Sequence, residues 1–351
     1  MFLRSANNPI LRANRGHDWE AFKVYNPGVI FAEGKYHLFY RAMNHSRDWR
    51  SSIGYAVSED GENFERFEQP LLVAESPAEK RGLEDPRITK VDQTYYMAYA
   101  SFDGLDVRLN IATSSDLKNW QKRGQALSDF EFLKNGGHKI TCHDGEIVNQ
   151  DDEQLDKEWS KSGAIFPQKI NNKYWLLFGE YNGWLANSDD GLQWQVLPDT
   201  FLNPRSGQGF DSAFVEVGPP PIKTELGWLV LYHGIDQWHT YRLSFMLLDL
   251  NDPTKIIYRH NDFIFEPLAD YELHSSLVDI ATGGVASEQE LSGEELRKHS
   301  NESVDQRKKI TVVFCCGAVV IDDKLRIYYG AGDEYICTAV AKLSDILVLV
   351  K

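Results

Sequence analysis

The stretch "NPGVIFAEGKYHLFYR", residues 26–41, decides the fold because the chain repeats its pattern. A turn with Pro or small residues leads into an apolar strand, a polar turn follows, and a second strand rich in aromatic residues completes the hairpin. The copies, here called units one to five, are residues 26–41, 84–100, 165–180, 218–234 and 316–332. Aligning their second strands places five residues in register: Arg41, Ala100, Gly179, His233 and Gly330.

A second motif recurs downstream of three of these hairpins. It reads "SEDGENF" at 58–64, "SSDLKNW" at 114–120 and "SDDGLQW" at 188–194. The Asp can close an Asx-turn, Gly supplies a positive φ, and the aromatic residue is expected to pack under the next strand. Repeated multi-strand units are typical of propellers, so the sequence predicts an all-β fold, a five-bladed β-propeller, in one domain spanning residues 1–351. An ordinary sandwich of hairpins is the alternative.

The composition narrows the range of partners. A net charge of −15 argues against nucleic acid and anionic membranes, and it fits a neutral ligand such as a sugar. The start of the chain lacks the apolar segment of a secretory signal, and no run approaches 18 apolar residues. The sequence therefore predicts a cytoplasmic protein with no membrane partner. It leaves the oligomeric state open, with a homo-oligomer among the alternatives.

The cysteines point to no metal site and no cofactor. They are Cys142, Cys315, Cys316 and Cys337, and none forms a pair with metal-ligand spacing. We expect reduced, structural thiols.

Two segments interrupt the repeat. Residues 143–159 are acidic and predict a solvated surface loop. Residues 268–309 form an insertion between units four and five, in which "SGEELRKH" (292–299) has the Ser N-cap and early acidic residues of a short helix. A flexible insertion and a lid or oligomer contact both remain open for it.

Carboxylates stand at the ends of several predicted strands. "GLEDPR" (82–87) holds Glu84, Asp85 and Arg87, which could serve catalysis or form a structural ion pair. "YWLLFGE" (174–180) is an apolar strand that finishes on Glu180, and Glu216 lies in the similar "AFVEV" (213–217) of the next unit. Exposure on a strand edge is the alternative for both glutamates. Paired carboxylates flanking a cleft are what glycoside hydrolysis requires.

These motifs together resemble glycoside hydrolase family 130, the mannoside phosphorylases and β-mannosidases. The resemblance rests on "NPGVI", "FYRA", "GLEDPRI", "RLNIATSSDLKNW", "IFPQKINNKYWLL", "GPPPIKTELGWLVLYHG" and "CGAVVIDDKLRIYYGAGDEYICTA", which together span about residues 22–343. It implies a five-bladed propeller and an inverting attack on a terminal β-mannoside. It also implies that Asp85 is the proton donor, acting through a hydroxyl of the mannose.

The family holds its terminal mannose with polar residues at strand ends. The candidate substrate-binding residues here are Asn26, Arg41, Ser52, Arg87, Arg108, Asp211, His233, Arg242 and Asp333. A buried core histidine is the alternative reading of His233.

The resemblance also separates two branches of the family. Phosphorylases typically carry a His-Arg pair where this chain has "FGE" and a Lys where it has Phe214, and those cations bind phosphate. Here Glu180 and Glu216 stand at or beside those positions, where they would repel phosphate and instead orient and deprotonate a water. The sequence does not decide which of the two glutamates is the base.

The predicted function is therefore an inverting exo-β-mannosidase acting on mannose-containing oligosaccharides with β-1,2 linkages. The donor and base carboxylates of an inverting enzyme lie roughly 6.5–9.5 Å apart, or farther when a relay intervenes. Three alternatives stay open: a phosphorylase that yields mannose 1-phosphate, a propeller glycosidase for another sugar such as an arabinoside or fructoside, and a non-catalytic sugar-binding propeller.

Overall fold

The computed structural model describes residues 1–44, 50–128, 160–273 and 311–350. Strands dominate this part of the chain, as the sequence predicts. The described helical segments are short: η1 (Asp18–Glu20), η2 (Pro77–Glu79), η3 (Asp270–Glu272), α3 (Leu343–Leu347) and η4 (Val348–Val350). Among the described residues, no helix combines the length and the apolar character needed to traverse a bilayer.

Units one and two lie in one eight-stranded sheet. Unit one contributes β2 (Lys23–Ala32), β3 (Lys35–Met43), β4 (Ser51–Ser58) and β5 (Glu65–Arg66). Unit two contributes β6 (Gly82–Val91), β7 (Thr94–Phe102), β8 (Val107–Ser114) and β9 (Gln121–Gln125). Neighbours within each unit are antiparallel, and the two units join through a short parallel contact at Ser51 and Gly82.

Unit three forms a four-stranded antiparallel sheet of its own. Its strands are β10 (Ala164–Ile165), β11 (Tyr174–Phe178), β13 (Trp184–Ser188) and β14 (Gln195–Val196).

Units four and five share a ten-stranded sheet. Unit four contributes β15 (Phe214–Val217), β16 (Ile222–Lys223), β17 (Trp228–Ile235), β18 (Thr240–Leu248) and β19 (Ile256–Arg259). Unit five contributes β20 (Thr311–Ile321), β21 (Lys324–Ala331) and β22 (Tyr335–Lys342). The sheet also takes in β12 (Glu180–Tyr181) and β1 (Leu3–Arg4). Because β1 pairs with β22, the beginning of the chain supplies the outer strand of unit five, a pairing that the repeat does not predict.

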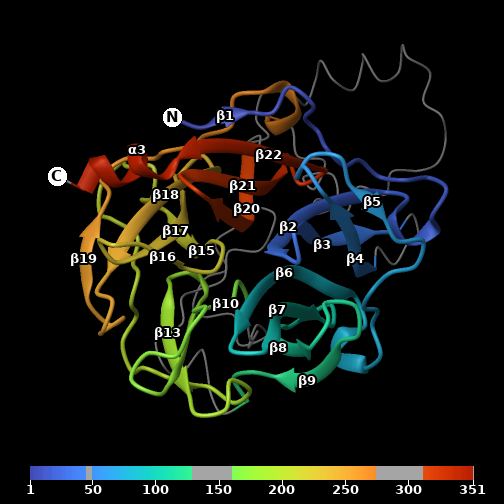
Figure 1. Cartoon of the computed structure of the whole chain (residues 1–351), viewed down its shortest axis with the longest axis horizontal. Coiled ribbons are helices and arrows are strands. Elements are labelled where there is room, and N and C mark those ends of the chain that lie inside the picture. The colour runs from blue at the N-terminus through green and yellow to red at the C-terminus, as the bar shows by residue number, and fades with distance from the viewer. Residues whose placement is uncertain (45–49, 129–159, 274–310, 351) are drawn as a thin grey trace, which may run out of the picture.

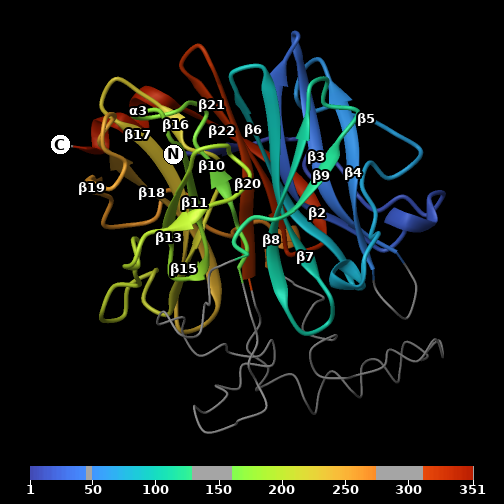
Figure 2. The same cartoon turned by 90° about the horizontal axis from the view of Figure 1, so that it is seen from below.

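The units follow one another around the middle of the molecule in Figure 1. The first strand of each unit lies nearest the middle, and β6 contacts β2, β10 and β20. Figure 2, turned by 90°, shows the strands of units one and two running along the axis down which Figure 1 is viewed. Residues at equivalent strand ends therefore gather at the same side of the molecule.

A bulge recurs in the first strand of units one, two and five. The register shifts between Tyr25 and Gly28, between Glu84 and Arg87, and again in β20. Asn26 and Asp85 occupy the first two bulges with φ of 48° and 51°, values that Asn and Asp tolerate better than most residues. The bulge re-aims both side chains, and the two meet in the middle of the molecule (see below).

The tip motifs form the predicted Asx-turns. Asp60, Asp116 and Asp190 each accept backbone N–H groups two and three residues further on, at 2.8 to 3.0 Å. These hydrogen bonds lower the pKa of Asp60 and of Asp116.

Two of the tip aromatics contact a neighbouring unit. Phe64 meets Tyr328 of unit five, and Trp120 meets Phe39 of unit one, each with its ring edge-on. Trp194 joins a core cluster built from strands of units two and three. The tips therefore help to fix one unit against another.

Several sequence predictions fall outside the described residues. They concern the acidic loop at 143–159, the helix at 292–299, Cys142 and most of the insertion at 268–309. Residues 268–273 are described, and there the buried Glu272 accepts hydrogen bonds from Arg4 and from the Tyr329 hydroxyl. The insertion therefore starts from a point anchored to β1 and β21.

The described cysteines are buried and free, as expected. Burial raises the pKa of Cys315 to about 12 and that of Cys337 further still, so these thiols stay protonated. In the described part of the chain, no group of His, Cys, Asp and Glu side chains is arranged to hold a metal ion.

Candidate active site

Two glutamates face each other at the boundary between units three and four. Strand β11 ends at Phe178, before the point that the sequence predicts, and Gly179 turns the chain with a φ of 120°. A Cβ atom on Gly179 would lie 2.3 Å from the carbonyl oxygen of Asn182, so the turn requires glycine. The chain then pairs with unit four as β12, which makes Glu180 the direct cross-strand partner of Glu216.

Lys161 lies between these glutamates. Its Nζ atom is 3.2 Å from Oε2 of Glu180 and 3.5 Å from Oε1 of Glu216. The neighbouring Ser162 hydroxyl donates a hydrogen bond to the same Oε1 of Glu216 at 2.5 Å. Our sequence reasoning missed both residues, because a lone Lys-Ser pair ahead of unit three belongs to no motif.

Burial controls the ionisation of this cluster. It raises the pKa of Glu180 and of Glu216, the latter to about 7, while the charge of Lys161 opposes the shift. Burial alone would lower the pKa of Lys161, but the two carboxylates outweigh it and hold that pKa well above its ordinary value. Lys161 is therefore a permanent cation between two carboxylates whose pKa values are both raised.

Asp85 occupies the bulge of β6. The Asn26 side-chain amide donates to Oδ1 of Asp85 at 2.9 Å, and Arg41 Nη1 lies 3.6 Å from the same oxygen. Arg41 also donates to Glu84 at 2.6 Å, and its guanidinium lies over the ring of Tyr25. The ion-pair partner of Glu84 and Asp85 is thus Arg41 of unit one, and Asp85 also accepts a hydrogen bond from the Asn26 amide.

The Asp85 and Glu180 groups belong to one electrostatic site. The charges of Asp85 and Glu84 both contribute to the raised pKa of Glu180. The middle of the molecule therefore collects four carboxylates from units two, three and four, with Arg41 and Lys161 as counter-charges.

Arg87 crosses from unit two to unit four. Its side chain is 1% exposed and donates to the carbonyl oxygens of Gly218 at 2.7 Å, Val217 at 2.8 Å and Asp85 at 3.2 Å. The guanidinium also lies 5.7 Å from the ring centroid of Phe314. Each of these contacts is structural, and a role in mannose binding stays a prediction for Arg87.

His233 is packed into the core beside the glutamates. Its Nε2 atom accepts a hydrogen bond from the Cys315 backbone N–H at 2.8 Å, and its ring stacks on Phe314 with centroids 4.4 Å apart. Burial first, and then the charge of Arg87, lower its pKa to about 3. His233 is therefore neutral, as the alternative reading of a core histidine has it, and mannose binding stays a prediction for it.

The arginines at two hairpin ends are held in local ion pairs. Arg108 donates to Asp103 at 3.0 Å and also to Asp106, across the β7–β8 loop. Arg242 donates to Asp236 at 2.7 Å across the β17–β18 loop. These ion pairs occupy both guanidinium groups, and sugar binding stays a prediction for them.

Asp211 is bound by residues of unit four. It is buried and accepts hydrogen bonds from Arg259 at 2.6 Å and from the Tyr232 hydroxyl at 3.2 Å. Among the remaining predicted residues, Ser52 lies on β4, and Asp333 lies in the β21–β22 turn, where its charge helps to raise the pKa of Arg41.

Tyr241 of β18 is a further residue that sequence reasoning missed. Burial raises the pKa of its hydroxyl well above the ordinary value, and the charges of Glu180, Glu216 and Asp333 add to the shift. Its ring also contacts Phe214 edge-on. The carboxylates of units three, four and five therefore share a tyrosine neighbour that no motif identifies.

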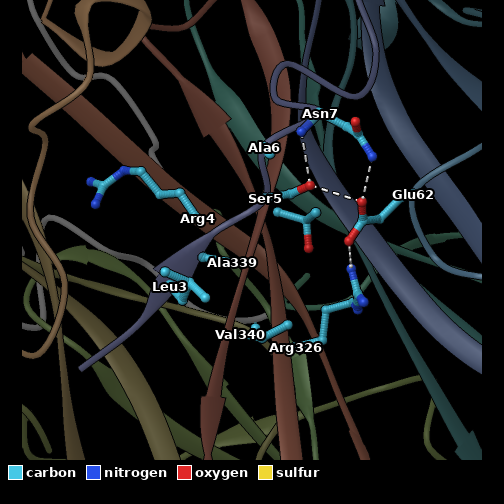
Figure 3. A pocket seen from close by; sticks show the side chains of 10 residues that line it. Leu3, Arg4, Ser5, Ala6, Asn7, Glu62, Arg326, Ala339 and Val340 are labelled. Atoms are coloured by element: carbon cyan, nitrogen blue, oxygen red, sulfur yellow. Dashed lines mark hydrogen bonds and ion pairs between the residues drawn. The ribbon is translucent and has the colours of Figure 1, made fainter.

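A cavity of about 400 Å³ lies elsewhere, at the outer side of unit five (Figure 3). It is lined by β1, the tip of unit one and β22. Its polar groups bind one another: Glu62 accepts from Ser5, Asn7 and Arg326 at 2.8 to 3.0 Å. We therefore place the active site at the carboxylates and not at this cavity.

Comparison with known proteins places this geometry in context. Residues 3–279 match the family model Glyco_hydro_130, described as β-1,4-mannooligosaccharide phosphorylase. The chain is 38% identical to a β-1,2-mannobiose phosphorylase of Thermoanaerobacter sp. (strain X514), over 98% of both chains. It is 33% identical to a 1,2-β-oligomannan phosphorylase of the same strain, again over 98% of both chains.

One similar solved structure is connected with hydrolases instead of phosphorylases. It comes from work stating that the GH130 family of mannoside phosphorylases contains glycoside hydrolases that target β-1,2 mannosidic linkages in Candida mannan. The likeness has a TM-score of 0.75 and 26% identity, over 98% of this chain and 94% of that one.

Proposed function

Because this chain belongs to glycoside hydrolase family 130, we propose that it is an inverting exo-β-mannosidase. It releases mannose from the non-reducing end of β-1,2-linked manno-oligosaccharides and uses water, not phosphate, as the acceptor. The β-1,2 linkage is supported by the relatives, since the two phosphorylases and the family hydrolases described above are all named for such linkages.

The charge balance around Glu180 and Glu216 carries the proposal. Two carboxylates face one lysine there, so the acceptor side of the site has an excess of negative charge. Two unit charges 4 Å apart interact by about 4 kcal/mol at the effective dielectric of a protein surface. When both carboxylates are ionised, a phosphate dianion would meet two repulsions for each attraction, whereas a neutral water meets acceptors for both of its protons.

The reaction divides between the two sides of the site. A glutamate removes a proton from water as the water oxygen bonds to the anomeric carbon, and the bond from that carbon to the leaving oxygen breaks. Asp85 supplies the proton that the leaving oxygen takes up, through a hydroxyl of the mannose as the family resemblance implies. Asn26 and Arg41 hold Asp85 in place for that transfer.

The fold supports an exo-acting site. We interpret the units as the blades of one five-bladed propeller spanning residues 1–351, with their first strands around the axis (Figure 1). The candidate residues then lie at one end of the axis, where a chain end can enter.

Phosphorolysis is the second candidate. It is favoured by the 38% identity to a β-1,2-mannobiose phosphorylase and by Lys161, a buried cation next to the acceptor position. The two activities differ in the acceptor only, so they share the donor side described above.

The stereochemistry of the first product tests the catalytic arrangement. With the methyl glycoside of β-1,2-mannobiose in water enriched in ¹⁸O, the only free mannose comes from the non-reducing end, and proton NMR of the earliest free mannose should show the α anomer, with ¹⁸O on its anomeric carbon. The reason is that water attacks the face opposite to the leaving group. Early β-mannose, or mannose without the label, would contradict the proposal.

A further inference from the structure

Resting on the proposed hydrolysis, we propose that Glu180 is the carboxylate that contacts and deprotonates the attacking water. Lys161 and Ser162 are positioning residues that hold Glu216 behind it. This assigns different tasks to two glutamates that occupy matching positions in paired strands.

Exposure separates the two glutamates. Glu180 is 8% exposed and Glu216 is 1% exposed, although both lie on the same short strand pair. A general base must lie within hydrogen-bond reach of the water that it deprotonates. Glu180 has the surface that such a water can touch, and Glu216 is covered.

The contacts separate them as well. Glu216 receives both the Ser162 hydroxyl and the Lys161 ammonium on one oxygen, Oε1. Its strand pairs on the other side with β17, where His233 is its cross-strand partner. The side chain of Glu216 is therefore held by Ser162 and Lys161, and its strand is held between β12 and β17. A residue held in this way is suited to orienting its neighbours. A general base must instead take up and release a proton.

Lys161 connects the two tasks. It bridges both carboxylates, so its charge allows both to be ionised at once and fixes the direction in which Glu180 points. The other charged or titratable groups near the two glutamates come from β6, β17, β18 and β20. They are Glu84, Asp85, Arg87, His233, Tyr241 and Cys316. Lys161 forms ion pairs with both glutamates.

Rescue by a small anion tests the assignment of the base. Glu180→Ala should lose about 10²–10⁴-fold in kcat on β-1,2-mannobiose. Sodium azide should restore turnover, because azide needs no deprotonation and fits the space left by the carboxylate. The product should be α-mannosyl azide, identified by mass spectrometry and NMR, as its nitrogen bonds to the anomeric carbon and mannose leaves.

The matched variant is Glu216→Ala. This variant should lose activity, and azide should not restore it. The reason is that the variant retains Glu180 as the base and lacks only the residue that helps to position it. Rescue of Glu216→Ala and not of Glu180→Ala would overturn the assignment, and so would the absence of rescue in both.

The pH profile tests the role of Lys161. Burial raises the pKa of both glutamates, that of Glu216 to about 7, so kcat/KM of the natural enzyme should fall on the acidic side as the glutamates gain protons. Lys161→Met removes the charge that opposes this shift, so the acidic limb should move to higher pH by about one unit, with kcat at least tenfold lower. Lys161→Arg should keep the limb in place.

The control is Lys173→Met, which removes a lysine from the same unit that pairs with the exposed Asp189. Its pH profile should match that of the natural enzyme. An unmoved limb in Lys161→Met would overturn the role of Lys161 even when the natural enzyme is a hydrolase. Failure of the proposed function is a separate result, since it appears in the products of the natural enzyme.

Discussion

Asp85→Asn is expected to lower kcat on β-1,2-mannobiose by about 10²–10⁴-fold, because asparagine cannot supply the proton that the leaving mannose requires. Asparagine is the smallest change available here. It accepts the hydrogen bond from Asn26 through its own side-chain oxygen, and it tolerates the φ of 51° that the bulge imposes. The binding constant for the disaccharide, measured by calorimetry, should change far less than kcat.

A control next to the same strand separates chemistry from structure. Asp92 begins the turn that follows β6, is exposed, and also has a positive φ of 55°. Asp92→Asn should leave kcat unchanged. Activity of a folded Asp85→Asn within tenfold of the natural enzyme would contradict the role of Asp85 as donor.

Arg87→Leu is expected to lower the free energy of unfolding by about 3–5 kcal/mol. The substitution removes the donors for three backbone carbonyls, those of Gly218, Val217 and Asp85, and leaves them without those hydrogen bonds. It also breaks a direct link between units two and four. Urea denaturation followed by tryptophan fluorescence should show the loss as a lower midpoint.

The same substitution at an exposed site provides the comparison. Arg123 is exposed on β9, and its side chain donates to the Thr113 hydroxyl. Arg123→Leu should change the unfolding free energy by less than about 1 kcal/mol. Equal midpoints for the two variants would show that Arg87 serves the ligand and not the fold.

The repeat explains why much of the fold could be predicted from the sequence. The hairpins and the Asx-turn tips are set by residues close in the chain, such as Asp60 and Gly61, so a short window contains their signal. The pairing of β1 with β22 joins opposite ends of the chain, and no local pattern encodes it. The pairing of Glu180 with β15 of unit four cannot be predicted from the local sequence either. The turn at Gly179 is explained by the close approach of this residue to the Asn182 backbone, which the sequence does not show.

The residues of the candidate site also divide into those that the sequence could indicate and those that it could not. Asp85, Glu180 and Glu216 could be named as candidates because acids at the ends of apolar strands are unusual, and because of the family resemblance. Lys161, Ser162 and Tyr241 could not, since each is ordinary in its own stretch and gains its meaning from strands of other units. Sugar binding by Arg87 stays a prediction, and its contacts with Val217 and Gly218 could not be predicted, since those partners lie more than a hundred residues away in the chain.

The central claim is that water, not phosphate, is the acceptor at Glu180 and Glu216. The direct measurement is to incubate the purified protein with β-1,2-mannobiose, with and without inorganic phosphate, and to resolve mannose from mannose 1-phosphate by chromatography. We predict free mannose at the same rate in both reactions and no mannose 1-phosphate. Mannose 1-phosphate that forms only when phosphate is present would contradict the account and make the enzyme a phosphorylase.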